Sequence, residues 1–317
     1  MKLLITGAEG DIADAICRIA RDAWPDAIVH GSDITGDDWP RLNGFAEIHT
    51  VPRATSQDYL KSLRLLHERE AFAAIVPVTD AELGILSAAS VDDLPLVMVD
   101  RHYLSVCLDK SRTAEWLEEI GLSGPRTIEL GDLSPADLPV IVKPRQGHGS
   151  AGLEIVRSAD RIPGVIRERS GDAIAQQYVG DASREFTSCV YRHRASGEMR
   201  TVILRRILQG GLTGRATVET SAAIEEVLSR IALAGDLDGS LNVQLRMTDD
   251  GPKVFEINPR FSSTVRMRHL IGFQDFVWTI DARMKNVAPP PWNPPSGTRI
   301  RRLSRELVIP PTAELRQ

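Results

Sequence analysis

Oxygen-bearing side chains cluster in the stretch from residue 240 to residue 263, S-L-N-V-Q-L-R-M-T-D-D-G-P-K-V-F-E-I-N-P-R-F-S-S. The pattern is typical of two strands joined by a tight turn at residues 249–252. Side chains alternate along a strand, so Glu256 and Asn258 should point the same way. If the strands pair antiparallel, Gln244 can reach the same place from the neighbouring strand. Mg²⁺ prefers such hard oxygen ligands when phosphate oxygens complete its octahedron, so the stretch is a candidate metal site.

The order of these residues also resembles a known family. A Glu and an Asn on one strand face are more often simply solvated, and spacing alone leaves both interpretations open. N-V-Q followed by F-E-I-N-P-R resembles the metal-binding end of the ATP-grasp superfamily, closest to the branch with carbamoyl-phosphate synthetase large subunits, biotin carboxylase and the pyrrolysine-pathway ligase. The resemblance implies that Gln244, Glu256 and Asn258 hold Mg²⁺ or Mn²⁺ on ATP. Arg260 follows on the same face, where it suits a phosphate and would offset charge on the transferring group.

Two lysines are candidate phosphate ligands. L-P-V-I-V-K-P indicates a short buried strand, and an inward Lys143 would need a negative partner because an unpaired buried charge is costly. An outward lysine would need none. Lys110 opens the amphipathic helix D-K-S-R-T-A-E-W-L-E-E-I-G, where a helix N-terminus and a lysine together suit an anion, although a lysine alone there is usually solvated. V-K-P and Lys110 both resemble phosphate-contacting positions of the ATP-grasp pattern.

A run of small residues, R-Q-G-H-G-S-A-G over 145–152, comes directly after V-K-P. Its backbone N–H groups can close over phosphates. No G-K-[ST] follows, so the run is not a Walker A motif. In this place it resembles the mobile flap of ATP-grasp enzymes. The resemblance implies that four of its residues bind the nucleotide, namely Gly147, Gly149, Ser150 and Gly152.

Two further segments are candidates for binding the adenosine. A-I-A-Q-Q-Y-V-G resembles the strand and linker that bind adenine in the family, which implies contacts from Gln177, Tyr178 and Val179. Where the family has a carboxylate, this chain has the amide of Gln177, which can still form hydrogen bonds. Glu185 opens R-E-F-T-S-C-V-Y, which resembles the family's E-Y-T-V segment and implies a contact with the ribose hydroxyls. The alternative is an ordinary glutamate on an edge strand.

Two adjacent arginines, Arg205 and Arg206, lie on the predicted strand T-V-I-L-R-R-I-L, so their side chains should face opposite ways. We expect one of them to meet the phosphates or a carboxylate substrate and list both as catalytic candidates with Arg260 and Lys143. The sequence does not say which of the pair, or Arg215 nearby, faces the site. Further substrate contacts are expected from the first lobe and from residues 266–269.

The order of elements predicts an α/β protein with a Rossmann-like N-terminal lobe, followed by the two-lobed ATP-grasp fold (α+β) that the resemblance implies. Strands are predicted at 2–6, 27–33, 47–52, 73–78 and 96–99, with helices between them, which is the alternation of a parallel sheet. Residues 79–82 form a capping-box pattern before a helix through residue 89. Later helices are predicted from residue 162, over 220–235 and over 269–284, and a terminal strand over 298–309. We expect a Rossmann-like domain over 1–100, an ATP-grasp N-terminal subdomain with helix and flap over 101–175, a C-terminal subdomain with the metal site over 176–288, and a proline-rich connector with a terminal strand over 289–317.

The composition and the absence of certain motifs argue against several classes of function. The net charge of −5 gives no general basic surface for nucleic acid. No apolar run is long enough for a membrane span or a signal peptide, and three separated cysteines without a C-x-x-C pair favour a cytoplasmic protein and argue against a zinc or iron–sulfur site. The glycine pattern at residues 7–13 also resembles NAD-dependent epimerases and reductases. No tyrosine is followed four positions later by the lysine that those enzymes need, so close packing of the first helix is the simpler explanation.

The resemblance covers nearly the whole chain and implies an ATP- and Mg²⁺-dependent ligase. Such an enzyme activates a carboxylate as an acyl phosphate and joins it to an amine, both small molecules. The alternatives are carboxylation or carbamoyl transfer through carboxyphosphate, and an ATP-binding subunit without turnover. The identity of the two substrates is open, and so is the oligomeric state, with a homodimer among the alternatives.

Overall fold

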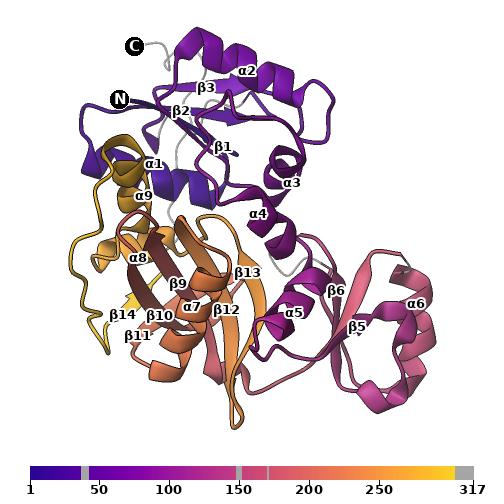
Figure 1. The fold of residues 1–317 in the computed structure, drawn as a ribbon. Coiled ribbons are helices and arrows are strands. Elements are labelled where there is room, and N and C mark those ends of the chain that lie inside the picture. The colour runs from indigo at the N-terminus through magenta and orange to yellow at the C-terminus, as the bar shows by residue number, and fades with distance from the viewer. Residues whose placement is uncertain (37–42, 148–151, 170, 304–317) are drawn as a thin grey trace.

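The computed structural model describes residues 1–36, 43–147, 152–169 and 171–303 (Figure 1). Its first lobe is a four-stranded sheet in the order β3-β2-β1-β4, with helices after β1, β3 and β4, and its strands are parallel as the sequence predicts. The strands are β1 (Lys2–Thr6), β2 (Ile28–Asp33), β3 (Glu47–Thr50) and β4 (Ala74–Val76), and the helices are α1 (Asp11–Ala23), α2 (Tyr59–Glu70) and α3 (Asp80–Ala88). The order 3-2-1-4 is that of a Rossmann-like half-sheet.

Local signals explain the helix starts of this lobe. Thr79 accepts a hydrogen bond from the Glu82 amide, and the Glu82 side chain accepts one from the Thr79 amide, which is the predicted capping box. The predicted fifth strand over 96–99 is wrong. Only one parallel bridge joins Leu96 to Ile75, because Pro95 lacks an amide hydrogen and the segment leads at once to α4 (Arg101–Cys107).

A smaller lobe follows the first. Its four-stranded antiparallel sheet has the order β5-β8-β6-β7 and packs on α6 (Ile162–Arg169) around a core of its own. The strands are β5 (Thr127–Glu129), β6 (Val140–Pro144), β7 (Glu154–Val156) and β8 (Ala173–Gln177). Helix α5 (Lys110–Glu119) leads into this lobe, and the predicted domain boundary at 175 lies inside β8.

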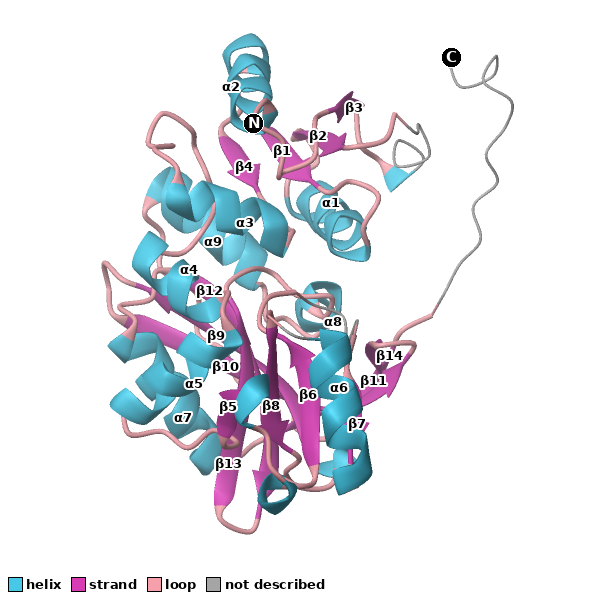
Figure 2. Cartoon of the chain, turned by 90° about the vertical axis from the view of Figure 1, so that its right-hand side faces the viewer, coloured by secondary structure: helices cyan, strands magenta, loops and turns pink. Residues whose placement is uncertain are grey.

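The third sheet is antiparallel, with the order β13-β12-β9-β10-β11-β14. Its strands are β9 (Glu185–His193), β10 (Glu198–Gln209), β11 (Leu212–Glu219), β12 (Gly239–Thr248), β13 (Gly251–Asn258) and β14 (Arg299–Arg301). Helix α7 (Ala222–Ala234) packs on one face with α4 and α5, and α8 (Val265–Leu270) and α9 (Asp275–Lys285) cover the other. The small sheet lies beside this sheet in Figure 1 and in front of it in Figure 2, so the two face each other.

The helix predicted over 269–284 is two helices in the structure, α8 and α9. Gly272 separates them with a positive φ of 93°, which the pattern of apolar residues did not disclose. Both helices share a core cluster with α1, so segments far apart in the sequence lie side by side in Figure 1. In place of the terminal strand predicted over 298–309 the structure has β14, and residues 304–309 lie outside the described residues. No helix in the described part of the chain is long and apolar enough to span a membrane.

Candidate active site

A cavity of about 440 Å³ lies between the small sheet and the six-stranded sheet. Its lining combines apolar side chains with charged and amide groups. The apolar residues include Ile141, Leu153, Ile155, Leu208 and Phe255, and the polar residues are Lys110, Lys143, Gln146, Gln176, Gln177, Tyr178, Glu185, Arg206, Gln244, Arg246 and Glu256. Apolar side chains with a few convergent polar groups are the usual lining of a small-molecule site.

Lys143 on β6 points into this cavity and is 7% exposed. Its amine donates to Gln176 Oε1 at 2.7 Å and to the Phe255 carbonyl at 3.3 Å, both of them neutral acceptors. Burial lowers the pKa of Lys143 to about 8, against the opposing field of Glu256. The strand therefore has its lysine inward, and the charge lies beside a cavity without a carboxylate in hydrogen-bond contact.

Lys110 reaches the same cavity from the first residue of α5. Its amine donates to the Gly147 carbonyl at 2.8 Å, which ties the helix to the loop after β6. The helix N-terminus is capped by Asp109, whose carboxylate accepts from the Ser111 amide and pairs with Arg145. The Asp109 carboxylate thus already occupies the N-terminus of α5. The Lys110 amine is the remaining group of this helix end that can contact a ligand in the cavity. Gly149 and Ser150 of the predicted flap lie outside the described residues, and Gly152 follows them without lining the cavity.

Glu185 lies at the start of β9 between two guanidinium groups. Arg206 on β10 and Arg246 on β12 contact its carboxylate at 2.7 and 2.8 Å, and Glu185 is 5% exposed. Strand β9 pairs with both β10 and β12, so the alternative of an edge-strand glutamate is wrong. The three side chains all line the cavity, and their mutual pairing fixes where each can meet a ligand.

The linker after β8 also borders the cavity, with Gln177, Tyr178 and Val179 in its lining. The Val179 carbonyl accepts a hydrogen bond from Arg246 at 3.0 Å, and the Arg246 guanidinium lies 5.0 Å from the centre of the Tyr178 ring. The linker is therefore held against the six-stranded sheet. The structure brings these three residues together with Glu185, as the sequence predicts for an adenosine site.

The three predicted metal ligands meet on the hairpin of β12 and β13. Gln244 is paired with Glu256 across the two strands, and Asn258 is two residues further on. Arg206 donates to Gln244 Oε1 at 2.7 Å. Among the described residues, neither the Glu256 carboxylate nor the Asn258 amide has a hydrogen-bond partner, and both border open space. Free oxygen ligands of this type fit Mg²⁺, so the residues present are compatible with the metal that the family pattern implies.

A second cavity, of about 210 Å³, adjoins the first at this hairpin. Arg206, Gln244 and Glu256 border both cavities, and Asn258 and Arg260 border the second. Its opposite wall comes from the first lobe, at the carboxyl ends of β1 and β4, where the strand order reverses and ligands commonly bind in such sheets.

The glycine turn after β1 forms part of that wall. Gly7 has a positive φ of 58°, and a side chain there would press on Val78 and Thr79 at 3.1–3.2 Å. Arg260 connects the two lobes, because its Nε donates to Asp80 Oδ1 at 2.6 Å. The predicted cation beside the metal ligands is thus already paired with a carboxylate from α3.

Other predicted residues lie elsewhere. Arg205 is on the opposite face of β10 from Arg206, where it pairs with Glu219, and it borders neither cavity, so the structure has Arg206 and not Arg205 at the candidate site. Arg215 is exposed on β11. Residues 266–269 border neither cavity, and Arg268 is buried in an ion pair with Asp275. Alternation along β10 shows that one arginine must turn away, but it does not say which face the small lobe covers.

Sequence reasoning missed several cavity residues, and three of them contact predicted site residues. Gln176 is 3% exposed and connects Thr127 to Lys143, so it orients the lysine. Arg246 holds Glu185, and Phe255 places its ring 5.8 Å from the Lys143 amine. A buried glutamine in the apolar strand A-I-A-Q-Q was a usable signal, because buried amides need partners.

Comparison with known proteins agrees with the geometry. Residues 107–264 match the family model of the ATP-grasp domain. Among curated proteins, the carbamoyl phosphate synthase large chain of Halobacterium salinarum is 27% identical over 267 residues, which cover 69% of this chain and 25% of that protein. The D-alanine–D-alanine ligase of Mycobacterium bovis is 28% identical over 208 residues, 55% of each chain. The chain thus spans about a quarter of the length of the first relative and about half of the length of the second.

The likeness also extends to solved structures. The N5-carboxyaminoimidazole ribonucleotide synthetase of Thermus thermophilus superposes with a TM-score of 0.72 at 17% identity, covering 99% of this chain and 86% of that one. An ADP complex of an enzyme of the same name also gives 0.72 at 17% identity, over 89% and 76%. At this identity the likeness shows the fold, which is the α/β lobe and ATP-grasp arrangement predicted from the sequence.

Proposed function

The chain contains an ATP-grasp domain, and from that premise we propose that it is an ATP- and Mg²⁺-dependent ligase that activates a carboxylate as an acyl phosphate and joins it to an amine, releasing ADP and phosphate. One observation carries the proposal. Arg206, Gln244 and Glu256 border two adjoining cavities at once, so groups that contact the end of a nucleotide in the larger cavity also face an acceptor in the smaller one. Phosphoryl transfer needs this juxtaposition of donor and acceptor.

The larger cavity suits a nucleoside triphosphate. Its volume lies within the range of roughly 300–1,000 Å³ that is usual for small-molecule sites. The apolar side chains of the lining can pack against a base, and Glu185 and the linker at Gln177–Val179 line the same cavity and can meet the ribose. The amines of Lys143 and Lys110 supply positive charge for phosphates, and among the described residues no carboxylate is in hydrogen-bond contact with Lys143.

The smaller cavity suits the acceptor. Its wall carries Arg260, Thr79, Ser262 and Ser263, which can orient a polar small molecule against Arg206. Bound Mg²⁺, for which Gln244, Glu256 and Asn258 are the ligand set that fits, would neutralise charge that develops on the transferring phosphoryl group. The chain's own residues bind, orient and exclude water. Exclusion of water matters because an acyl phosphate hydrolyses readily.

Two alternatives follow from the relatives' names. Carbamoyl phosphate synthase and the carboxyaminoimidazole synthetases suggest bicarbonate as the carboxylate, and D-alanine–D-alanine ligase suggests an amino acid. An ATP-binding subunit without turnover is disfavoured, because Lys143, Glu256, Asn258 and Arg206 are all present and line two adjoining cavities.

A screen for ADP release tests the proposal. The purified chain with MgATP is assayed against pools of carboxylic acids, with and without amines and with bicarbonate, and products are weighed by mass spectrometry. An ¹⁸O-labelled carboxylate should transfer one label to the released phosphate. Amide product with labelled phosphate supports the ligase. Bicarbonate-dependent ADP release with a carboxylated product would favour the first alternative, and the absence of any stimulated ADP release would contradict turnover.

A further inference from the structure

Two buried histidines lie at one edge of the first-lobe sheet, away from both cavities. His30 on β2 and His49 on β3 are 5% and 8% exposed, and the strand β3 ends the order β3-β2-β1-β4. His30 is paired in register with Glu47, and His49 comes two residues after Glu47. Because side chains alternate along strands, the three side chains project from the same face of the sheet. A histidine is unusual at either position, because the strands of parallel sheets are mostly apolar.

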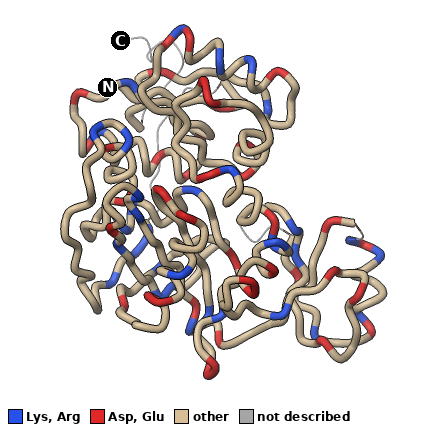
Figure 3. The backbone as a smooth tube through the Cα atoms, viewed as in Figure 1, with Lys and Arg blue, Asp and Glu red and all other residues tan. Residues whose placement is uncertain are grey.

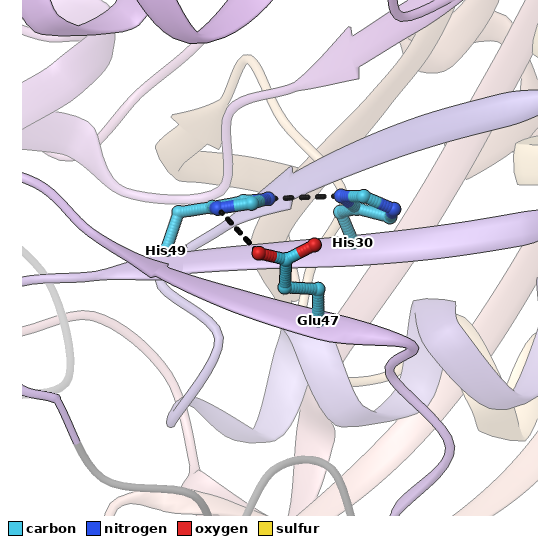
Figure 4. A group of neighbouring side chains, drawn as sticks. All are labelled: His30, Glu47 and His49. Atoms are coloured by element: carbon cyan, nitrogen blue, oxygen red, sulfur yellow. Dashed lines mark hydrogen bonds and ion pairs between the residues drawn. The ribbon is translucent and has the colours of Figure 1, made fainter. Parts of the chain in front are cut away.

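The side chains converge on one point. His30 Nδ1 and His49 Nε2 are 2.8 Å apart, and Glu47 Oε1 is 3.6 Å from His49 Nδ1 (Figure 4). One ligand atom from each of the three residues lies within 4.8 Å of the others. Figure 4 shows the Glu47 carboxylate beside the line that joins the two rings. The Glu47 side chain is 52% exposed, which leaves the site one side open to solvent.

We propose that His30, His49 and Glu47 form a binding site for a first-row transition metal ion, with Zn²⁺ the best fit. Two imidazoles and a carboxylate are the donor set of such ions, and Mg²⁺ does not prefer it. Tetrahedral Zn–N bonds of about 2.0–2.1 Å place two nitrogens roughly 3.3 Å apart, so the rings must separate by only about 0.5 Å. The fourth position, on the exposed side, is left for water.

The protonation states agree with this role. Burial lowers the pKa of His30 and of His49, so both rings are neutral at pH 7 and can donate a lone pair. Arg69 lies 3.2 Å from His49 Nδ1, which in the metal-free protein leaves the proton on Nε2, shared with His30. Metal binding moves that proton to Nδ1, beside Glu47. Arg69 can turn away, since its side chain is 62% exposed and also pairs with Glu70.

Other charges beside the histidines are paired. Glu70 pairs with Lys2 at 2.9 Å and with Arg69 at 2.8 Å, so among the described residues the Glu47 carboxylate is left to offset the charge of a metal ion. Phe72 packs against both rings, with centroids 5.5 and 6.5 Å away, and closes the inner side. The metal would connect β3 to β2 and thereby stabilise the edge of the sheet; it is separate from the proposed ATP chemistry.

The test is a Zn²⁺ titration of the full chain, stripped by chelation and held in excess Mg²⁺ to occupy oxygen sites. Competition with a chromophoric chelator should give one Zn²⁺ per chain with a dissociation constant below ~1 μM, and the melting temperature should rise on binding. Glu47→Gln should weaken Zn²⁺ at least ~10-fold, and His49→Gln should weaken it further. His102→Gln, which removes an exposed histidine on α4, is the matched control and should bind Zn²⁺ as the wild type does.

Each outcome of the Zn²⁺ titration either supports or overturns the proposed site. Binding that is lost in Glu47→Gln and His49→Gln but kept in His102→Gln supports the site, and Co²⁺ at the same site should show the absorption of a tetrahedral complex. Unchanged affinity in both ligand variants, or no stoichiometric Zn²⁺ in the wild type, overturns it and leaves a neutral hydrogen-bonded histidine pair packed on Phe72. Because Glu47 is exposed, its variant keeps the test valid if His49→Gln fails to fold.

Discussion

Lys143 should reduce the stability of the free protein while it increases affinity for ATP. Its amine is buried with two neutral acceptors, and its pKa falls from 10.5 to about 8. At about 1.36 kcal/mol per pKa unit, this shift corresponds to about 3 kcal/mol of unfavourable burial of the charged form. Lys143→Met removes that charge and also two hydrogen bonds worth roughly 1 kcal/mol each. The variant should therefore be about 1–2 kcal/mol more stable than the wild type without nucleotide at pH 7.

The same variant should bind ATP more weakly. Loss of a charge-assisted phosphate contact costs about 1.5–3 kcal/mol, or roughly 10- to 100-fold in affinity. A rise in stability together with a fall in ATP affinity is expected when a buried charge lowers the stability of the free protein but binds the ligand. Lys253→Met, on β13 but outside both cavities, is the control and should change neither property appreciably.

The pH dependence gives a second test of Lys143. Because its pKa is lower in the folded state, the unfolded chain binds more protons between about pH 8 and pH 10.5, and wild-type stability rises in that window relative to Lys143→Met. Chemical denaturation at pH 7 and pH 10 with calorimetric ATP titration measures both effects. A variant that is less stable than the wild type at pH 7 and binds ATP normally would refute the reasoning.

Three further predictions use matched variants. Glu256→Gln should keep ATP binding within several-fold but lower turnover at least ~10²-fold, as measured by ADP formation, because the carboxylate acts mainly in the transition state; near-normal turnover at limiting Mg²⁺ would show that Glu256 is no metal ligand. Arg206→Met should reduce kcat for ADP formation, whereas Arg205→Met, on the other face of β10, should not; equal effects would contradict the placement. Glu185→Gln leaves two largely buried guanidiniums without their carboxylate and should destabilise the protein by about 3 kcal/mol in denaturant titrations; a loss below ~1 kcal/mol would show that the pairing is weak.

The hairpin that carries the predicted metal ligands could be predicted from the sequence, apart from its register. Alternation along two strands and the turn at 249–252 predict that Gln244 can reach the face that carries Glu256 and Asn258, and in the structure a register shift between Gln244 and Leu245 sets Gln244 opposite Glu256. The capping box at Thr79 follows from an equally local rule, whereas the sequence leaves the orientation of Lys143 open and the structure has it inward. The hairpin and the capping box depend on residues that are close together in the sequence, so a single sequence is enough to predict them.

Features that depend on how lobes meet could not be predicted. The pairing of Arg260 with Asp80 joins residues 180 positions apart, and the orientation of Arg206 rather than Arg205 depends on the face that the small lobe covers. The argument against a zinc site considered cysteines, and it had no means to place His30 next to His49. The roles of the site residues and the four-part division of the chain stay predictions.

Figure 3 bears on the class of ligand. Lysine and arginine positions are intermixed with aspartate and glutamate positions along the described chain, with no lobe of a single sign. Positive charge is instead in excess at the larger cavity. Four basic side chains and two carboxylates line it, namely Lys110, Lys143, Arg206 and Arg246 with Glu185 and Glu256. A small polyanion fits this arrangement better than an extended one.

The most direct test of the central claim is a calorimetric titration of the full chain with ATP, with and without Mg²⁺, beside the same titration with NAD⁺. The account predicts one ATP bound per chain, tighter with Mg²⁺ than without it, and no measurable NAD⁺ binding. NAD⁺ binding tighter than ATP binding would contradict it, because the glycine turn after β1 would then be the nucleotide site and the cavity at Lys143 would not.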